Sequence, residues 1–201
     1  MDRILFNIAL AGYFVSTTGY LCSLLFKRIF PAKISTWLLT FAFSVHGTAL
    51  FTQYFLTGQS PVNSCYGSVS FFAWVIAGAY LVFQLRTKTR ILGAIVSPVT
   101  FLMVFAASTQ MPGRGLLPEN LQGPLVSVHV ILSVAGEALF ALVALAGMLY
   151  LLQDRQIKKR RLHAMSRLLP PLKDLDRINH YGLLFGFPVL TFGLLAGSVW
   201  A

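Results

Sequence analysis

Apolar residues occur along this chain in long blocks, which are separated by polar segments. Each block reaches the ~20 residues that a helix needs to cross ~30 Å of hydrocarbon. The strands of a membrane β-barrel would be shorter and would alternate in polarity, which these blocks do not. The pattern predicts an all-α integral membrane protein with six transmembrane helices, at about residues 4–26, 34–56, 66–85, 91–109, 124–152 and 180–201.

The composition agrees with this pattern. The chain of 201 residues is 56% hydrophobic and 11% charged, which leaves too little polar surface to cover a soluble core. We therefore expect a single polytopic membrane domain over residues 1–201. The first apolar block is too long for a cleaved signal peptide and no A-x-A site follows it, so we expect it to remain as a helix.

The basic residues are distributed unevenly between the predicted loops. Of the 16 Lys and Arg residues, all but Arg3 and Arg114 fall in the first, third and fifth loops, and the fifth loop, residues 153–179, is the most basic. Because positive loops stay in the cytoplasm, we predict these three loops inside and both termini outside. This distribution accounts for the net charge of +10 without a nucleic-acid partner. Cys22 and Cys65 would then lie on opposite sides of the membrane, where a disulfide between them is not expected.

Two histidines lie inside the predicted helices. Motifs of soluble enzymes are absent, so the candidate chemistry depends on ionisable residues in the membrane, where they are costly. His129 lies about five residues from the outer end of the fifth helix, roughly 7 Å below the interface. A neutral imidazole there can ligate a haem iron or hydrogen-bond a neighbouring helix. His46 lies near mid-membrane beside Gly47, which lets a flat macrocycle or a second helix approach closely. For His46 too, haem binding and a structural role in helix packing both stay open.

Glu137 is the third ionisable candidate. It follows His129 by eight residues, so at about 100° per residue the two side chains are offset by about 80° on one side of the helix. A carboxylate at that depth should be protonated or paired. It is a candidate to hydrogen-bond the Nδ1–H of a ligating histidine. The alternative is a protonated acid bonded to a helix backbone. His180, at the start of the sixth helix, is expected to be an interfacial residue.

The last 27 residues read LDRINHYGLLFGFPVLTFGLLAGSVWA, with a charged start and an apolar continuation. The glycine pairs Gly182/Gly186 and Gly193/Gly197 place small residues four apart, which lets a neighbouring helix pack closely. Pro188, between these pairs, is expected to kink the helix or to open it locally.

Three segments together resemble one family. The chain ends with L-D-x-x-x-x-Y, then G-F-P-x-L-T-x-G, then G-x-x-W-A, and residues 92–98 read L-G-A-I-V-S-P. The loop after the second helix has Gly67 where the family carries an acidic residue, and otherwise fits with Pro61, Asn63, Tyr66, Ser68, Phe71, Phe72 and Trp74. In these patterns the chain resembles the cytochrome c assembly membrane proteins of the CcsA/ResC type.

The resemblance carries expectations about the site. In that family the next residues form a tryptophan-rich segment that handles haem. The chain would therefore lack this segment and everything after it, and would form the N-terminal part of a bundle of about eight helices. Haem b would bind transiently, with His129 as an outer iron ligand and Trp200 at the same face. His46 matches the family's intramembrane histidines, which are thought to bind haem in transit, only by its place in the helix.

The resemblance also implies a function, namely haem handling or delivery at the outer face of the membrane for covalent assembly of c-type cytochromes. Expected partners are haem, a second membrane protein of the assembly system and apocytochrome c, at the bacterial cytoplasmic (inner) membrane. Enzyme status stays open, because the reactive thiols of a haem lyase reaction belong to the apocytochrome. The alternatives are a regulator of haem synthesis on the same fold, a scaffold subunit, and a small-solute or proton-coupled transporter that uses His46 and Glu137. A transporter should show internal repeats, and none is evident.

Overall fold

The computed structural model describes residues 3–26, 29–58, 60–87, 90–109, 118, 123–159 and 170–200, and for residues 29, 90 and 200 it describes the backbone alone. The described residues form helices and no strands. The helices are α1 (Arg3–Leu25), α2 (Ile29–Thr57), α3 (Cys65–Arg86), α4 (Arg90–Ser108), α5 (Pro124–Lys158) and α6 (Leu172–Trp200). All six are long and apolar enough to cross a membrane, so the predicted number and type of elements is confirmed.

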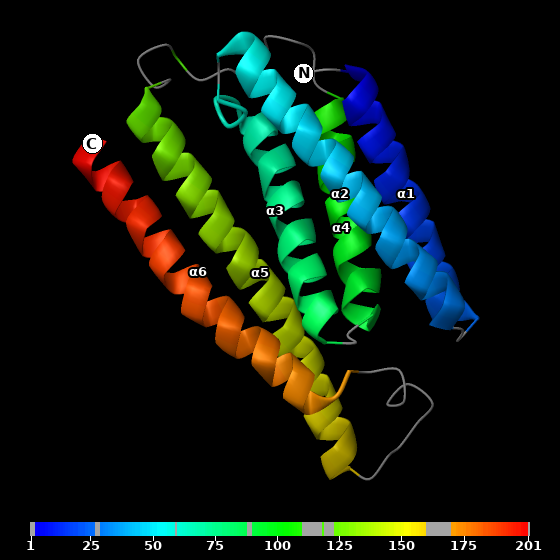
Figure 1. Cartoon of the computed structure of the whole chain (residues 1–201). Helices are drawn as coiled ribbons and strands as arrows, with labels where there is room; N and C mark the ends of the chain where they lie inside the picture. The colour runs from blue at the N-terminus through cyan, green and yellow to red at the C-terminus, as the bar shows by residue number, and fades with distance from the viewer. Residues whose placement is uncertain are drawn as a thin grey trace.

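The helices run alternately up and down, and both termini lie at one end of the bundle (Figure 1). This end is called the upper end, and it holds the start of α1, α3 and α5 and the close of α2, α4 and α6. Helices α1 to α4 pack together, and α5 connects this group to α6 through its contacts with α3. The α5–α6 pair therefore lies along one side of the bundle.

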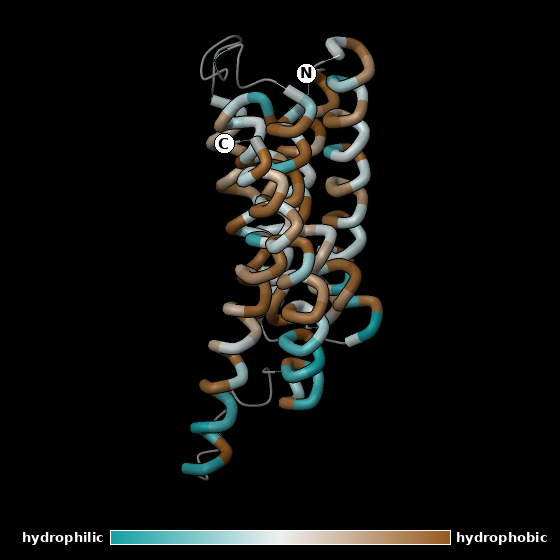
Figure 2. Tube along the Cα trace, turned by 90° about the vertical axis from the view of Figure 1, so that its left-hand side faces the viewer, coloured by the Kyte–Doolittle hydropathy of each residue, from teal (hydrophilic) through white to brown (hydrophobic). Residues whose placement is uncertain are grey.

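Three helices extend further than the apolar blocks predicted. Helix α2 starts at Ile29, α5 continues to Lys158 and α6 starts at Leu172. The predicted loop 153–179 is thus helical at both ends. The predicted bounds marked the end of apolar sequence, but a helix can continue into polar sequence where a neighbouring helix covers one side. Figure 2 shows this polar continuation at the lower end.

The start of α6 has a local cause. Pro170 and Pro171 directly precede it, and proline is tolerated at a helix start because its missing N–H would be unpaired there anyway. The carbonyl of Pro171 accepts the backbone N–H groups of Asp174 and Leu175 at 2.9 and 3.2 Å. Leu175 and Ile178 are then fully buried, which gives this extension an apolar contact.

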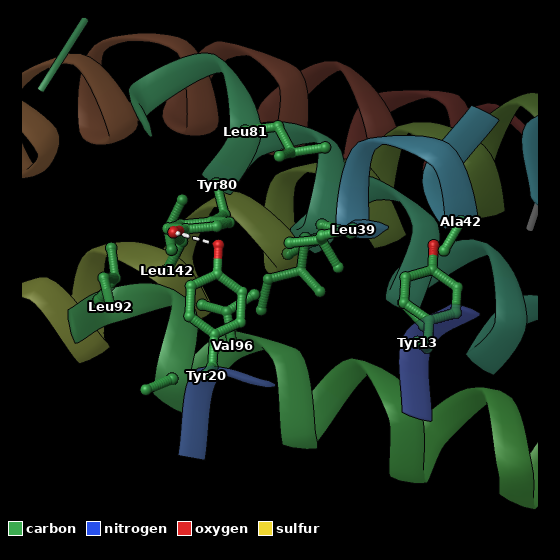
Figure 3. Packing of buried hydrophobic residues seen from close by; sticks show 14 of the residues in the cluster. Tyr13, Tyr20, Leu39, Ala42, Tyr80, Leu81, Leu92, Val96 and Leu142 are labelled. Atoms are coloured by element: carbon green, nitrogen blue, oxygen red, sulfur yellow. Dashed lines mark hydrogen bonds between the residues drawn. The ribbon is translucent and has the colours of Figure 1, made fainter. Parts of the chain in front are cut away.

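Side-chain hydrogen bonds connect α1 with α2, α3 and α4 in the core. The Tyr20 hydroxyl lies 3.1 Å from the Tyr80 hydroxyl, and Figure 3 shows these two side chains meeting from α1 and α3. Tyr20 also bonds Thr36 of α2 at 2.9 Å, and Thr17 bonds Ser97 of α4 at 2.7 Å. Hydroxyls buried without partners would be costly in hydrocarbon, so these pairs specify how the four helices fit together.

Glycines bring α5 and α6 together. A Cβ atom added at Gly182, Gly186, Gly193 or Gly197 would meet α5 at 3.2 Å or closer, and one added at Gly136 of α5 would meet Leu190 of α6 at 2.7 Å. The predicted close packing of the two glycine pairs is confirmed, and their partner is α5.

Candidate functional site

His129 lies near the upper end of the α5–α6 pair. Helix α5 begins at Pro124, and the His129 side chain, which is half-buried, points to α6. Its Nδ1 lies 2.7 Å from the backbone carbonyl oxygen of Gly193. Because a carbonyl oxygen only accepts, Nδ1 carries the proton and donates it. The Ser133 hydroxyl lies 3.5 Å from the same nitrogen, which is too long to compete.

This arrangement selects one tautomer of the imidazole. With the proton on Nδ1, Nε2 of the neutral ring is an unprotonated lone-pair donor. None of the hydrogen bonds formed within the described residues involves His129 Nε2. A histidine whose Nδ1–H is held by a carbonyl and whose Nε2 is free is the usual state of an imidazole that binds a metal.

The ring lies directly on Gly197 of α6. A Cβ atom at Gly197 would come within 2.6 Å of the His129 ring, and one at Gly193 would come within 2.7 Å of Ser133. Gly197 therefore makes room for the imidazole, and Gly193 lets the two helices approach closely enough for its carbonyl to reach the ring. Trp200 ends α6 one turn beyond Gly197, while its side chain lies outside the described residues.

Glu137 does not take part in this arrangement. Its side chain is exposed, and the acceptor of the His129 Nδ1–H is the Gly193 carbonyl. The two side chains are offset by about 80° around α5, and the positions of α3 and α6 leave the carboxylate exposed. A role of Glu137 in orienting His129 therefore has no support in this geometry.

His46 lies elsewhere, between α1, α2 and α3, and is fully buried. Its Nε2 lies 2.9 Å from the Ser70 hydroxyl and its Nδ1 lies 3.3 Å from the Tyr13 hydroxyl. The rings of Phe6 and Tyr13 contact it edge-on. Both nitrogens are thus occupied, which matches the structural interpretation of this residue. Iron could bind His46 only after a hydroxyl was displaced.

The space next to Gly47 is also filled. The Trp74 indole of α3 lies there, 3.0 Å from where a Cβ atom of Gly47 would be, and its Nε1–H donates to the Phe43 carbonyl at 3.1 Å. The Phe43 and Trp74 rings stack at 5.0 Å. The expectation that Gly47 admits a close neighbour is correct, but within the described residues that neighbour is an aromatic side chain of the bundle.

A cavity of about 560 Å³ opens beyond Trp74, at the upper end between α2, α3 and α5. This volume is in the range of small-molecule sites. Its walls include the aromatic residues Phe51, Tyr54, Phe71 and Trp74, with Asn63 and Ser127 as polar groups. Neither His46 nor His129 lines it. Sequence reasoning missed this cavity, although four residues of the Pro61–Trp74 segment contribute to it.

The presence of glycine at position 67 of that segment, where the family carries an acidic residue, has a structural reason. A Cβ atom there would collide with the backbone carbonyl of Pro61, and the Gly67 N–H donates to the Ser64 hydroxyl, which caps α3, at 3.0 Å. The turn before α3 therefore has no room for the acidic side chain that the family pattern has at this position.

The remaining candidate site residues do not form a cluster. His180 is exposed and contacts Tyr181 edge-on. Within the described parts of the chain, no three His, Cys, Asp or Glu side chains lie close enough to hold a metal ion together. A metal at His129 would therefore bring its other ligands with it, as the iron of a macrocycle does.

Comparison with known families identifies the chain. The family described as Cytochrome C assembly protein matches residues 62–201, more than two thirds of the sequence. The chain belongs to this family. Membership supports a haem-related role in cytochrome c assembly, and the six apolar helices make the chain a multi-pass membrane protein.

Individual relatives of two names match the chain. The chain is 25% identical to cytochrome c biogenesis protein CcsA of Pyropia yezoensis, over 100% of this chain and 76% of that protein. It is 27% identical to CcsA of Guillardia theta, over 97% of this chain and 71% of that protein. It is also 25% identical to protein HemX of Brevibacillus brevis, over 87% of this chain and 62% of that protein.

Proposed function

We propose that this chain handles haem at the upper end of the α5–α6 pair and delivers it for covalent assembly of c-type cytochromes. The observation that carries the proposal is the state of His129. Its Nδ1–H is committed to the Gly193 carbonyl, and its Nε2 is free of hydrogen bonds from the described residues. An anchored Nδ1–H with an open Nε2 is the arrangement that a metal-binding histidine needs.

The residues present fit a haem iron at one of the two predicted positions. His129 offers its Nε2, which none of the described residues bonds, at the end of the pair where Trp200 closes α6. His46 offers no free nitrogen while Ser70 and Tyr13 occupy both of its nitrogens. We therefore assign iron ligation to His129 and leave His46 a packing role. When bound, haem supplies the group that is joined to the cysteines of an apocytochrome, and His129 holds it at the upper end.

The proposal includes an orientation. The basic residues of α5 and α6, among them Arg155, Lys158, Lys173 and Arg177, lie near the end of α5 and the start of α6, which are at the lower end (Figure 1). Positive segments stay in the cytoplasm, so the upper end faces outward. Haem, a second membrane protein of the assembly system and apocytochrome c would meet the chain there, in a bacterial cytoplasmic membrane.

Haem absorbance tests the ligand. Purified chain in detergent is titrated with haem, and we expect a Soret band typical of a histidine-ligated iron. His129→Ala should remove most of the band, and His46→Ala should leave it unchanged. His129→Gly should recover the band when free imidazole is added, because the small ligand can occupy the vacated space. Equal spectra for wild-type protein and His129→Ala would contradict the proposal.

Thiol labelling tests the orientation. Cys65, at the start of α3, is exposed at the upper end, and Cys22 lies near the lower end of α1. In single-cysteine variants on intact cells, a membrane-impermeant maleimide should label Cys65 and spare Cys22. Labelling of Cys22 alone would reverse the assigned orientation while leaving the His129 assignment in place.

A further inference from the structure

The cavity between α2, α3 and α5 changes in polarity along the bundle. At the upper end its walls carry polar groups, namely Ser60 and Asn63 before α3 and Ser127 in the first turn of α5. It extends down α2 to Gly47, which lies 10 residues before the end of that helix, or ~15 Å along its axis. The walls at that depth are apolar. The cavity is therefore a slot that leads from the interface into the hydrocarbon.

The polar groups at the upper end of the slot have unused hydrogen-bonding capacity. The side-chain oxygen of Asn63 accepts the Ser127 hydroxyl at 3.3 Å, and no hydrogen bond within the described residues uses the two N–H groups of the same amide. The Ser60 hydroxyl oxygen is buried and has no partner in the described parts of the chain. Buried polar atoms without partners are costly, so a bound molecule that offers an acceptor oxygen here would be stabilised.

The walls limit which molecule can occupy the slot. None of the described residues that line it is charged, and none is a histidine. A haem in this place would lack both an imidazole for its iron and a cation for its carboxylates. The slot therefore suits a neutral molecule with an apolar body.

The size of the slot excludes a transmembrane helix. A helix about 10 Å wide occupies ~420 Å³ in each turn, and about six turns are needed to cross the hydrocarbon. The slot holds about 560 Å³, which is little more than one turn. This limit applies equally to a helix of a second copy, of a partner protein or of any further part of this chain.

We propose that the slot binds one acyl chain of a phospholipid, and that the ester carbonyl of this chain accepts a hydrogen bond from the Asn63 amide. The chain then passes Leu50 and Ile131 toward the middle of the membrane. Phe51 and Tyr54 line the slot and are exposed, so it opens toward the hydrocarbon, from which a lipid can enter. An ester is neutral, which agrees with the uncharged walls.

The lipid would support α5 on the side away from the haem ligand. Ser127, Val128 and Ile131 form the α5 wall of the slot, whereas the His129 ring lies on Gly197 of α6. Lipid binding thus needs neither haem nor the imidazole, and it can be measured independently of the proposed function.

Quenching of tryptophan fluorescence tests the proposal. Trp74 lines the slot, and Trp37→Phe with Trp200→Phe leaves it as the single tryptophan of the chain. This protein in lipid-free detergent is titrated with phosphatidylcholine that carries bromine on its acyl chains, and we expect quenching that saturates near one lipid per chain. A dialkyl ether analogue with the same bromines lacks the carbonyl oxygens. It should bind about threefold to tenfold more weakly, the range of one neutral hydrogen bond.

Substitutions in this single-tryptophan protein locate the lipid. Asn63→Leu should remove the preference for the ester, and Ser60→Ala, which is a smaller change in the same turn, should reduce it. Val128→Phe adds bulk to the α5 wall and should abolish saturable quenching. Val82→Phe is the matched control, because Val82 is also exposed but lies at the lower end of α3, and it should bind the lipid normally.

Three results would overturn the proposal: quenching that rises without saturation, equal affinity for the ester and the ether, or unchanged lipid binding in Val128→Phe. Circular dichroism checks that each variant is folded. His129→Ala should bind the brominated lipid as the unsubstituted chain does, so a failure of the lipid site and a failure of the haem-ligand assignment can be told apart.

Discussion

His46 and His129 both lie in apolar helices, but the bundle treats them in opposite ways. His46 is enclosed by α1, α2 and α3, and hydroxyls occupy both of its nitrogens. His129 lies between two helices near the upper end, and one backbone carbonyl holds one nitrogen. The number of partners, rather than depth alone, separates a histidine that stabilises a core from one that is available to a ligand.

The packing around the two histidines differs in the same way. Around His46, side chains from three helices converge and each bond depends on a hydroxyl. Around His129, the absence of side chains at Gly193 and Gly197 is what allows the approach. Substitutions around His129 should therefore act on both haem binding and stability, and substitutions around His46 should act on stability alone.

The largest effect is expected from Gly197→Leu. The new side chain would occupy the space of the His129 ring, which lies 2.6 Å from the position of its Cβ. The imidazole must then leave the Gly193 carbonyl, and α5 and α6 must move apart. We expect haem absorbance to fall to that of His129→Ala, with a loss of about 3 kcal/mol in the free energy of unfolding. Circular dichroism during transfer to denaturing micelles measures the second quantity. Retained haem binding would show that the glycine contact does not hold the ligand.

Gly193→Ala tests the same contact between α5 and α6 with a smaller added side chain. Its Cβ would lie 2.7 Å from the Ser133 backbone nitrogen, which cannot rotate away. We expect a loss of about 1–3 kcal/mol in the free energy of unfolding. Gly147→Ala is the matched control, since it lies on the same helix pair with its nearest neighbour, Asn179, 3.9 Å away. There alanine should be neutral or should stabilise the helix by up to about 1 kcal/mol. Similar losses in both variants would mean that crowding at Gly193 is not the cause.

The difference between these glycines also shows how far the sequence alone could lead. The apolar blocks predicted six helices because each block is long enough to span hydrocarbon, and the spacing of the glycine pairs predicted close packing. The partner of His129 could not be predicted, since every residue carries a backbone carbonyl and nothing marks that of Gly193. His46 posed a similar problem, because Tyr13 and Ser70 are 33 and 24 residues away. The exposure of Glu137 depends on where α3 and α6 lie, which the helical offset from His129 does not determine.

His46→Ala tests whether the buried histidine contributes to stability and not to haem binding. Removal of the buried ring leaves the hydroxyls of Tyr13 and Ser70 without a partner and opens a space in the core. We expect a loss of about 1–3 kcal/mol in the free energy of unfolding. The haem absorbance at saturation should stay as in wild-type protein, provided that the titration is done where the variant is folded. A parallel loss of haem absorbance in folded His46→Ala would return this residue to the candidate ligands.

The smallest effects should separate the two bonds of His46. Ser70 lies 2.9 Å from Nε2, a normal hydrogen-bond length, whereas Tyr13 lies 3.3 Å from Nδ1. Interhelical hydrogen bonds in membranes average about 0.6 kcal/mol and reach about 1.7 kcal/mol. Ser70→Ala should therefore destabilise the bundle by about 1 kcal/mol and Tyr13→Phe by about 0.5 kcal/mol, each measured by the same unfolding assay. A larger loss in Tyr13→Phe would reverse the ranking of the bonds. Because the phenyl ring keeps its edge-on contact with the imidazole, that result would assign the dominant role to the Tyr13 hydroxyl and not to the aromatic packing.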